Sequence, residues 1–263
     1  MKKAISCFLS FCLLFAFSVP VFAQENTASN SIASSDAGTY EEYYTGFSAS
    51  ARQKIAEMIG SGNVAKVKSS TYYLPGNSLQ RGNISASSLS LTITKSYICP
   101  NKGNKITSVL VAISWEWAAN KPVYRGKDAI SLNWDSTYFI KSSDDSGVAF
   151  YAQDVYRSNS SDEWTVYKEY NTLAMASQGG LGHYTDLKAL KKYVGGAMII
   201  LLEPRRSIVK GNGFSSELNV EYVHSYLPIT GLGFSTNDFG ISVSWDRGCD
   251  YLSASNSLYF SFE

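Results

Sequence analysis

Two histidines and two cysteines are the residues most suited to nucleophilic chemistry. The histidines are His183 and His224, and the cysteines outside the apolar N-terminal segment are Cys99 and Cys249. A thiolate beside a histidine forms the pair that cysteine hydrolases use, but it requires a reduced thiol. In an exported protein, an even number of cysteines usually pairs in disulfides. We therefore expect a disulfide between Cys99 and Cys249, with two buried thiols as the alternative.

The two histidines lie in different sequence contexts. His224 continues the alternating apolar pattern of 218–222, which predicts a core or hydrogen-bonded histidine. His183 lies in the glycine-rich run 179–184, which predicts a flexible loop. His183 is therefore the better candidate for a functional histidine.

The remaining motifs do not define a catalytic or metal site. Ser207 and Lys210 have the S-x-x-K spacing of serine β-lactamases, in which the serine opens a helix. Here Pro204 and the turn 211–213 bracket a β-like stretch, which would place the two side chains on opposite faces. The sequence has no H-E-x-x-H or G-x-S-x-G motif. We expect no cofactor and no metal.

Carboxylates offer another route to catalysis. A glycosidase needs two carboxyl groups on either side of the scissile bond. The candidates are Glu116, Asp135, Asp154 and Glu169, which lie far apart in the chain. Their spacing does not bring any two together, so a hydrolase stays an alternative. The lack of a catalytic motif favours a protein that is not an enzyme.

Aromatic residues give the strongest compositional signal. They make up 14% of the chain, against 17% for charged residues, and 18 of them are tyrosines. Tyrosine-rich surfaces present flat amphipathic faces to sugar rings or partner proteins, although β-sheets also favour aromatics for packing. The residues that we select as binding candidates are Tyr43, Tyr44, Tyr72, Tyr73, His183 and Tyr184.

The first 39 residues differ in composition from the rest. Lys2 and Lys3 precede an apolar run that ends in small residues, the layout of a bacterial secretory signal peptide over 1–23. We expect cleavage between Ala23 and Gln24, followed by a flexible spacer rich in Ser, Ala and Asn over 24–39. A single mostly β domain then covers 40–263, in a secreted protein with no transmembrane segment in its mature chain.

The formal net charge is +1, so the chain is nearly neutral. A neutral chain gives no electrostatic reason to expect nucleic acid or an anionic membrane as the main partner. The aromatic content instead suggests a carbohydrate or a cell-surface protein as the partner, whose identity the sequence does not give.

Two segments have helical spacing. Over 50–60, Ser50 and Gln53 fit a capping box, an apolar stripe follows, and Gly60 is placed to end the helix. Over 185–194, two inward leucines, lysines near the end and a glycine afterwards predict a second, shorter helix.

The rest of the chain alternates with a period of two residues. Over 89–97, Leu, Ile and Tyr alternate with Ser and Thr, which predicts a strand with one solvent-exposed face, and 109–117 predicts its hairpin partner. The run 197–202 is apolar on both faces, so we place it in the middle of a sheet. These patterns predict a mainly β fold: an antiparallel two-sheet β-sandwich of jelly-roll or Greek-key type with one N-terminal and one short internal helix.

Three functional classes fit such a protein. The first is a binding or interaction module for a glycan or a surface partner, which needs no catalytic residues. The second is a pore-forming or membrane-active protein that uses the hairpin 85–117, whose first strand has a polar face and an apolar face. The third is a secreted hydrolase with an unidentified carboxylate pair.

Overall fold

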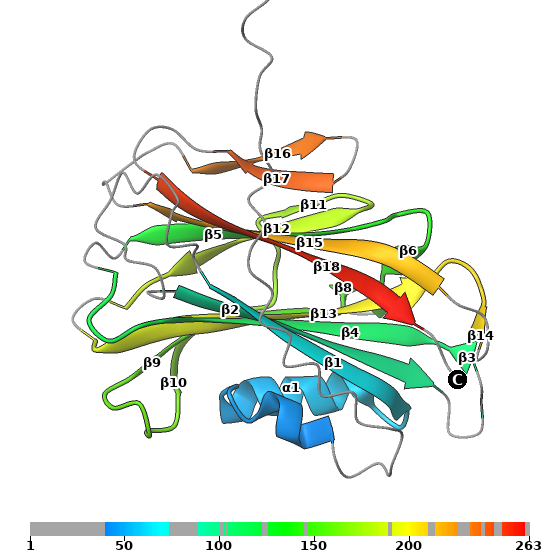
Figure 1. Cartoon of the computed structure of the whole chain (residues 1–263), viewed down its shortest axis with the longest axis horizontal. Coiled ribbons are helices and arrows are strands. Elements are labelled where there is room, and N and C mark those ends of the chain that lie inside the picture. The colour runs from blue at the N-terminus through cyan, green and yellow to red at the C-terminus, as the bar shows by residue number, and fades with distance from the viewer. Residues whose placement is uncertain are drawn as a thin grey trace, which may run out of the picture.

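The computed structural model describes residues 40–73, 89–99, 103, 105–122, 126–144, 147–188, 191–209, 214–225, 232–237, 240–244 and 249–260. Within these ranges the chain is mainly β with antiparallel sheets, as the sequence predicts, and it has one α-helix where the sequence predicts two. Figure 1 shows two large sheets one above the other and the helix outside them. The predicted signal peptide over 1–23 and the predicted spacer over 24–39 both lie outside the described residues.

The larger sheet has seven strands. They are β1 (Asn63–Tyr73), β2 (Leu89–Cys99), β4 (Ser108–Trp117), β6 (Phe139–Lys141), β9 (Phe150–Arg157), β10 (Thr165–Tyr170) and β13 (Tyr193–Pro204). Their order is β1-β2-β4-β13-β9-β10, and β6 pairs with the end of β13. β13 lies between β4 and β9 and is buried over most of its length, which confirms the central position predicted for 197–202.

The smaller sheet has five strands. They are β5 (Lys127–Trp134), β11 (Met175–Ala176), β12 (Gly180–Asp186), β15 (Phe214–Ser225) and β18 (Cys249–Phe260). Their order is β11-β12-β5-β15-β18, and every pair is antiparallel.

Three two-stranded ribbons complete the β-structure of the described ranges. They are β3 (Lys105–Ile106) with β14 (Ile208–Val209), β7 (Ser143–Asp144) with β8 (Gly147–Val148), and β16 (Gly233–Asn237) with β17 (Gly240–Ser244). The β16–β17 ribbon lies against the smaller sheet on the side away from the larger one (Figure 1). The Asn133 amide of β5 holds it there, because Nδ2 donates to the Ile241 carbonyl at 2.8 Å and Oδ1 accepts from the Ile241 N–H at 2.7 Å.

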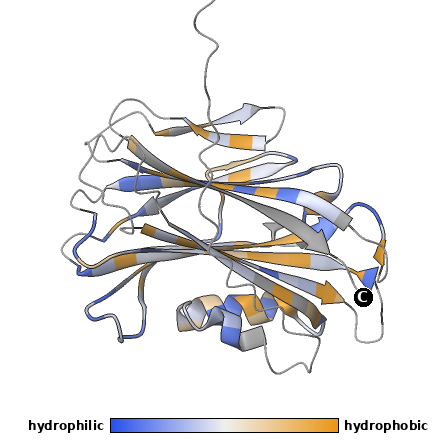
Figure 2. Ribbon diagram, in the orientation of Figure 1, coloured by the Kyte–Doolittle hydropathy of each residue, from blue (hydrophilic) through white to orange (hydrophobic). Residues whose placement is uncertain are grey.

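One hydrophobic core joins the two large sheets. Leu91 and Ile113 of the larger sheet and Leu132 and Val220 of the smaller sheet are fully buried in the same cluster. Figure 2 shows apolar stretches along the strands in the middle of the molecule. Each such side chain contributes about 1.5 to 3 kcal/mol when fully buried. The two-residue periodicity of the sequence therefore identifies the inward faces of both sheets.

The predicted hairpin from 89 to 117 is present as β2 and β4. Its register pairs Leu89 with Trp117 and Ile98 with Ser108. The hairpin lies in the interior of the larger sheet, because β1 pairs with the other edge of β2 and β13 with the other edge of β4.

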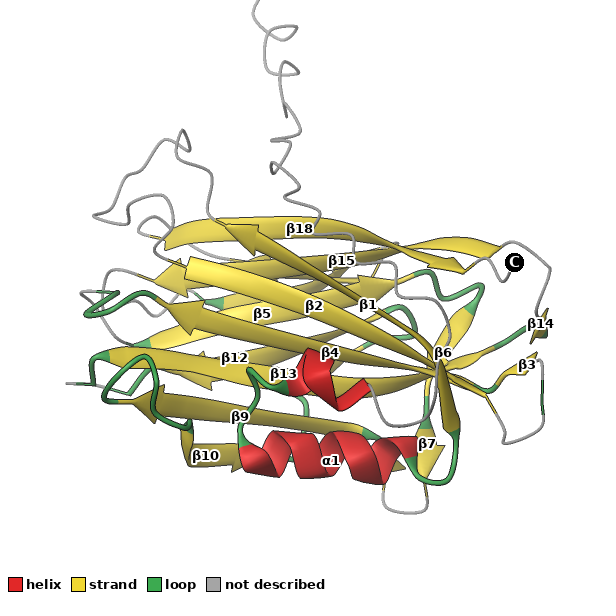
Figure 3. Ribbon diagram, turned by 60° about the horizontal axis from the view of Figure 1, so that its bottom comes forward, coloured by secondary structure: helices red, strands yellow, loops and turns green. Residues whose placement is uncertain are grey.

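The N-terminal helix α1 (Ala49–Ile59) covers part of the outer face of the larger sheet, together with the 3₁₀ turn η1 (Tyr40–Tyr44) (Figure 3). The cap is Ser48 rather than the predicted Ser50: Ser48 has extended dihedral angles and its Oγ accepts from the Ala51 N–H at 3.2 Å. Gly60 ends the helix with φ of 57°, as predicted. No helix in the described ranges is both long and apolar enough to cross a membrane.

The short helix predicted over 185–194 is wrong. Thr185 lies in β12 of the smaller sheet, and Tyr193 begins β13 of the larger sheet. The residues described between these strands connect the two sheets. Leu187 is buried in the core and its N–H donates to the Gly126 carbonyl at 3.2 Å. An inward leucine followed by lysines therefore belongs to a connection between sheets here, although the same pattern is typical of a helix end.

The structure does not contain the predicted disulfide between Cys99 and Cys249. Cys99 ends β2, whereas Cys249 pairs with Ser225, beside His224, whose ring lies 4.8 Å from Trp117. Trp117 pairs with Leu89, at the other end of β2. The two cysteines are therefore separated by the length of a strand, about 30 Å at about 3.3 Å per residue, and a disulfide tolerates about 7 Å between Cα atoms.

Candidate functional site

The outer face of the larger sheet changes from apolar to polar along its strands. Because side chains two residues apart share a face, each cross-strand row can be read from the register. Under α1 the row is Thr94, Ala112, Ile199 and Tyr151. Two residues further along, the row is Thr92, Ser114, Ala197 and Gln153, and the next is Ser90, Glu116, Gly195 and Val155. Small and polar side chains therefore collect where the helix no longer covers the sheet.

The Ser and Thr face of β2, which the sequence predicts to be solvent-exposed, is exposed only in part. Thr94 and Ser96 are fully buried, and the Ser96 Oγ lies 2.5 Å from the Tyr44 hydroxyl of η1. Ser90 and Thr92 are half-buried at the uncovered end of the strand. The difference comes from η1 and α1, which cover one half of this face.

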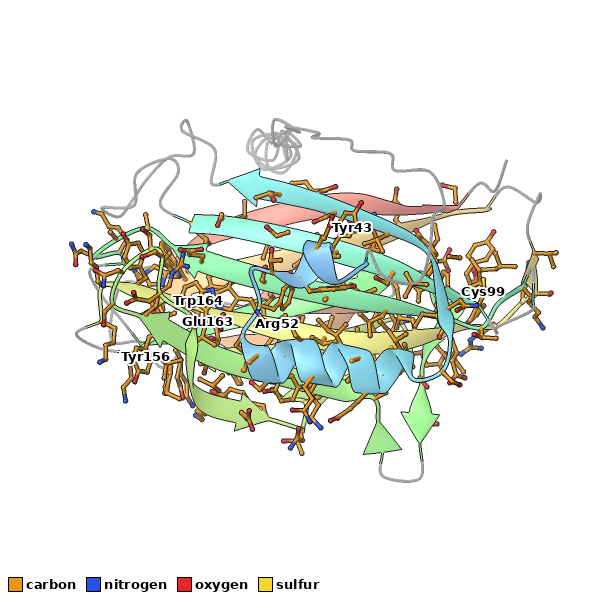
Figure 4. The ribbon with its side chains drawn as sticks, turned by 90° about the horizontal axis from the view of Figure 1, so that it is seen from below. Tyr43, Arg52, Cys99, Tyr156, Glu163 and Trp164 are labelled. Atoms are coloured by element: carbon orange, nitrogen blue, oxygen red, sulfur yellow. The ribbon has the colours of Figure 1, made fainter. Side chains whose placement is uncertain are left out.

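A pocket of about 230 Å³ lies over the uncovered polar rows. Tyr43, Phe47 and Ser48 line it on the side of η1 and the start of α1, and Trp164, from the connection between β9 and β10, lines it as well. Figure 4 shows Tyr43 and Trp164 on the side of the sheet that carries α1. The volume is below the about 300 to 1,000 Å³ of sites for drug-sized ligands, so the pocket suits a single ring or a chain end.

Arg157 fixes two groups of the pocket. Its Nη2 lies 2.5 Å from the Glu116 Oε1, and its guanidinium lies 4.2 Å from the centre of the Trp164 ring and 5.5 Å from that of Tyr193. The ion pair is partly exposed, so it contributes little to stability. A guanidinium over an indole contributes about 0.5 to 1 kcal/mol at an exposed site, and it orients the ring. Trp164 therefore has a defined position although it stands in a polar connection.

Gln153 organises the floor of the pocket. Its Oε1 accepts from the Ser48 Oγ at 2.8 Å and the Ser50 Oγ at 3.0 Å, and it lies 3.1 Å from the Tyr151 hydroxyl. The Tyr151 hydroxyl also lies 2.7 Å from the Glu169 Oε1 and, having one hydrogen, donates to Glu169 or to Gln153 but not to both. Burial raises the pKa of Tyr151 to about 12, so the phenol stays protonated as a donor. These contacts orient the Gln153 amide before any ligand arrives, which lowers the entropy cost of binding.

The groups in the pocket suit binding better than acid/base catalysis. Among the described residues that line it, Glu116 is the one carboxylate, and Arg157 compensates its charge. The described residues also contain no group of three His, Cys, Asp or Glu side chains that could hold a metal ion. Hydroxyls, an amide and aromatic faces remain, and these groups hydrogen-bond and stack with a polar ring.

A second polar cluster lies inside the protein, between the two sheets. The Asp128 carboxylate accepts from the Tyr222 hydroxyl at 2.6 Å and lies 2.8 Å from the His224 Nδ1, and Trp117 Nε1 donates to the Tyr222 hydroxyl at 3.2 Å. The backbone N–H of Ser225 also donates to Asp128 at 3.4 Å. Burial, together with the negative charge of Asp128, raises the pKa of Tyr222 well above its usual value. His224 is thus a buried, hydrogen-bonded histidine, as the sequence predicts.

Asp154 forms a further buried contact between the sheets. It accepts from the Thr185 hydroxyl, from the Tyr170 hydroxyl at 2.5 Å and from the Asp186 N–H at 2.9 Å. Burial raises the pKa of Asp154 to about 6, although these hydrogen bonds oppose the shift. This carboxyl group, a candidate acid or base in the sequence, therefore serves as an internal acceptor that joins β9 to β12.

Of the tyrosines selected from the sequence, the structure places one in the pocket. Tyr43 lines it and is half-buried. Tyr44, the last residue of η1, is buried against α1 and the larger sheet, and Tyr72 is buried in the core between the sheets. The backbone of Tyr73 pairs with Ser90, and its side chain lies outside the described part of the structure. Core packing thus accounts for Tyr44 and Tyr72.

His183 and Tyr184 lie on the smaller sheet, away from the pocket. The flexible loop predicted around His183 is wrong: it belongs to β12 and is 2% exposed, with its ring 4.5 Å from that of Tyr170. Burial lowers the pKa of His183 to about 4, so the ring is neutral near pH 7. Tyr184 packs its ring 4.8 Å from Phe234 and donates its hydroxyl to the Leu232 carbonyl at 3.2 Å.

Sequence reasoning missed most residues of the pocket. Gln153, Ser48 and Trp164 carry no motif, and they meet through sheet register and through the position of α1. One signal was available: Trp164 follows Asp162 and Glu163, and a tryptophan among charged residues is unusual for a core position.

Comparison with known proteins does not assign a family. No family model matches the chain, and no curated protein matches it. Among the solved structures that match is a chain described as "Complete structure of manganese lipoxygenase of Gaeumannomyces graminis and partial structure of zonadhesin of Komagataella pastoris". It shares 9% identity over 76% of this chain and 67% of that chain, with a TM-score of 0.21, a similarity too low to carry any inference about fold or function.

Proposed function

We propose that this protein is a secreted β-sandwich, of jelly-roll or Greek-key type, that binds carbohydrate through the pocket at the start of α1. One observation supports this above the others. A tryptophan ring oriented by Arg157 stands beside a floor of hydroxyl and amide groups, in a pocket sized for a single ring. Aromatic faces stack on the apolar faces of sugar rings, while hydroxyls and amides bond to sugar hydroxyl groups.

The edge and the floor of the pocket would make different contacts with a sugar ring. Trp164 and Tyr43 offer aromatic surface at its edge, and Ser90, Thr92 and Ser114 offer hydroxyls on the floor. Gln153 is already oriented by Ser48 and Ser50, so little side-chain ordering remains for the ligand to induce. A neutral polar ring is the ligand class that uses both kinds of group.

The proposal is tested by glycan-array binding of the full protein and of Trp164→Ala. We expect Trp164→Ala to weaken binding roughly tenfold or more, because stacking on the indole is lost, and Trp164→Tyr to restore part of it. Tyr138→Ala is the matched control, since Tyr138 is also half-buried and also stacks against an arginine, Arg206, at 5.6 Å. Binding that is unchanged in Trp164→Ala, or no binding to any glycan on the array, would contradict the proposal.

Two other functions stay predictions. For a membrane pore, the β2–β4 hairpin would have to separate from β1 and β13, which pair with it on both sides. For a hydrolase, a second carboxylate would have to lie beside Glu116 in the pocket. The candidate Asp135 does not line the pocket: it accepts from the Thr137 N–H at 2.8 Å in a turn. Dye release from liposomes and polysaccharide hydrolysis by the purified protein measure these two activities directly.

We also propose that the chain is exported, with cleavage after Ala23. The lysines and apolar run of 1–23 support this. N-terminal sequencing of protein recovered from culture medium checks it: a first residue of Gln24 is the expected result.

A further inference from the structure

The strands at the ends of the two large sheets differ in how they are protected against pairing with another chain. The strand orders end at β1, β10, β11 and β18. An end strand presents unpaired N–H and C=O groups, and proteins limit such pairing with short strands, bulges and charged residues. β11 has only two residues. β1 and β10 each have a shift in register and two charged residues, Lys66 and Lys68 in β1 and Lys168 and Glu169 in β10.

β18 has none of these protections. It is 12 residues long and pairs with β15 without a shift in register, from Cys249 opposite Ser225 to Phe260 opposite Phe214. Its one charged residue is Asp250, close to its start, and it contains no proline. Among the strands that the structure describes, none pairs with its other edge, and Figure 3 shows β18 beside β15 at one side of the molecule. β18 is therefore a long edge strand with a row of backbone groups suited to strand addition.

The sequence of β18 is nearly the same in both directions. Residues 251–259 read Tyr-Leu-Ser-Ala-Ser-Asn-Ser-Leu-Tyr, and reversing the order changes only Ala254 and Asn256. If two such strands pair antiparallel about a twofold axis at Ser255, tyrosine lies opposite tyrosine, leucine opposite leucine and serine opposite serine. No charged residue lies in this stretch, so the two strands do not repel each other. The strand is therefore complementary to a second copy of itself.

This register also matches the faces of the two sheets. Leu252 is 2% exposed and lies in the core between the sheets. In the symmetric register Leu252 lies opposite Leu258 of the second copy, and both positions are on the inward face because they are separated by an even number of residues. A displacement by one residue would join an inward face to an outward one, and a displacement by two would place Leu252 opposite Asn256 or Phe260. One register therefore fits best.

We propose that β18 pairs with β18 of a second copy of this chain, antiparallel about a twofold axis at Ser255. The two smaller sheets then form one continuous sheet across the dimer. Assembly stops at two copies, because a twofold contact uses the same strand of both chains and the other end strands are short, irregular or charged. The contact involves the smaller sheet and not the pocket on the larger one, so this proposal is independent of carbohydrate binding.

The experiment uses a reversal of charge at the twofold axis. Ser255→Lys places two lysines opposite each other in the dimer, and Ser255→Glu places two carboxylates there, so each variant alone should raise the dissociation constant of the dimer about fivefold or more. An equimolar mixture of the two variants should restore the dimer, because lysine then lies opposite glutamate. Sedimentation equilibrium of the full protein at about 1 to 100 μM, in reducing buffer so that no disulfide joins the chains, measures all three.

Two further variants complete the design. Ser69→Lys adds the same charge to a serine of β1, the other long edge strand, and should change the dissociation constant less than about twofold. Ser255→Cys preserves the size of the side chain, so it tests the contact even if a charge at this position impairs folding. In oxidising buffer it should give a covalent dimer that mass spectrometry shows to be linked through position 255 of both chains, since opposite residues of antiparallel strands lie within the range of a disulfide.

The contrary results are equally specific. A natural protein that is monomeric at about 100 μM overturns the proposal. A dimer that neither Ser255→Lys nor Ser255→Glu weakens is formed by another surface, which overturns it too. If both variants are folded monomers and their mixture stays monomeric, or if Ser255→Cys gives no dimer linked through position 255, the two strands do not meet at Ser255 and the proposed register is wrong.

Discussion

The protein has two polar clusters built from similar residues, and they differ in what their groups contact. Inside, Asp128, His224, Tyr222 and Trp117 bond mainly to one another and are at most 2% exposed. Outside, half-buried Glu116 and Trp164 line a pocket that is open to solvent, and Ser48 and Gln153 form its floor, although they are themselves only 2% and 1% exposed. A histidine and an aspartate at hydrogen-bonding distance look catalytic in isolation. Here both residues bond to other buried groups of the core, whereas the proposed ligand would bind at the less conspicuous serines and glutamine of the pocket.

The difference follows from dielectric environment. A buried polar group without a partner costs about 1 to 3 kcal/mol, so an internal network is stable only when its members satisfy one another. A group at the surface can bond to water and exchange that water for a ligand at little cost. We therefore expect substitutions inside to change stability and substitutions in the pocket to change binding.

The largest effect is expected for Asp128→Ala. The substitution leaves the Tyr222 hydroxyl and His224 Nδ1 without their acceptor in the core, which should lower the free energy of unfolding by about 3 to 5 kcal/mol. Urea denaturation measures the loss. Asp135→Ala is the control, because Asp135 accepts two bonds from Thr137 in an exposed turn and should cost less than about 1 kcal/mol. Equal losses in both variants would remove the distinction between the clusters.

The next effect concerns pH, because Asp154 and His183 titrate in opposite senses. The pKa of Asp154 is raised to about 6 in the folded state, so its contribution to stability is present at low pH and is lost as the pH rises through 6. The pKa of His183 is lowered to about 4, so its contribution is present above 6.5 and is lost as the pH falls toward 4. Each changes the stability by about 2 kcal/mol between pH 4.5 and 7, and the two nearly cancel.

Variants separate these opposing contributions. In Asp154→Asn the stability should rise by about 2 kcal/mol more than in the natural protein between pH 4.5 and 7, and in His183→Gln it should fall by a similar amount relative to it. Asp186 and Lys168, the other charged neighbours of this pair, are present in every variant and so cancel in the comparison. Unfolding in urea at the two pH values measures the change. Parallel curves for all three proteins would show that neither group is perturbed by burial.

The inward faces of the strands could be predicted from the sequence, because alternation records which side of each strand meets the core. Ile130, Leu132 and Trp134 of β5, for example, all lie in the core between the sheets. The helix could be predicted as well, but its cap was placed at Ser50 instead of Ser48, because Gln53 completes a capping box with Ser50 whereas Ala51 follows Ser48 at that spacing. The sequence of a strand does not show which other element covers its outer face. The burial of Thr94 and Ser96 under η1 and α1 was therefore missed.

The glycines around His183 show why a local pattern can mislead. They suggested a loop, but Gly180 and Gly182 lie in β12, at positions where other elements approach the strand closely. A Cβ atom at Gly182 would lie 2.6 Å from the Phe234 ring, and one at Gly180 would lie 2.3 Å from the Asn133 Oδ1. These glycines make room for the β16–β17 ribbon, a tertiary requirement that a single sequence does not reveal.

The pocket could not be predicted, for a similar reason. Its floor is one row across four strands, Thr92, Ser114, Ala197 and Gln153, from segments more than a hundred residues apart at the extremes. None of these residue types is unusual at the surface of a sheet. These residues form a pocket floor because the strand order places β13 between β4 and β9. The helix α1 covers the neighbouring apolar part of the same face and leaves this row uncovered.

The smallest effect is expected at the boundary between the two kinds of region, where Ser48 both caps α1 and lines the pocket. Ser48→Ala removes the acceptor for the Ala51 N–H and one donor to Gln153, so we expect a loss of about 1 kcal/mol in unfolding free energy. Ser50→Ala is the matched control: it also removes a donor to Gln153, but Ser50 is not the cap, and its cost should be about 0.5 kcal/mol or less. If Ser50→Ala is the more destabilising of the two, the helix begins where the capping box of the sequence places it. If both variants keep full stability but bind glycan more weakly, Ser48 contributes to ligand binding and not to the stability of α1.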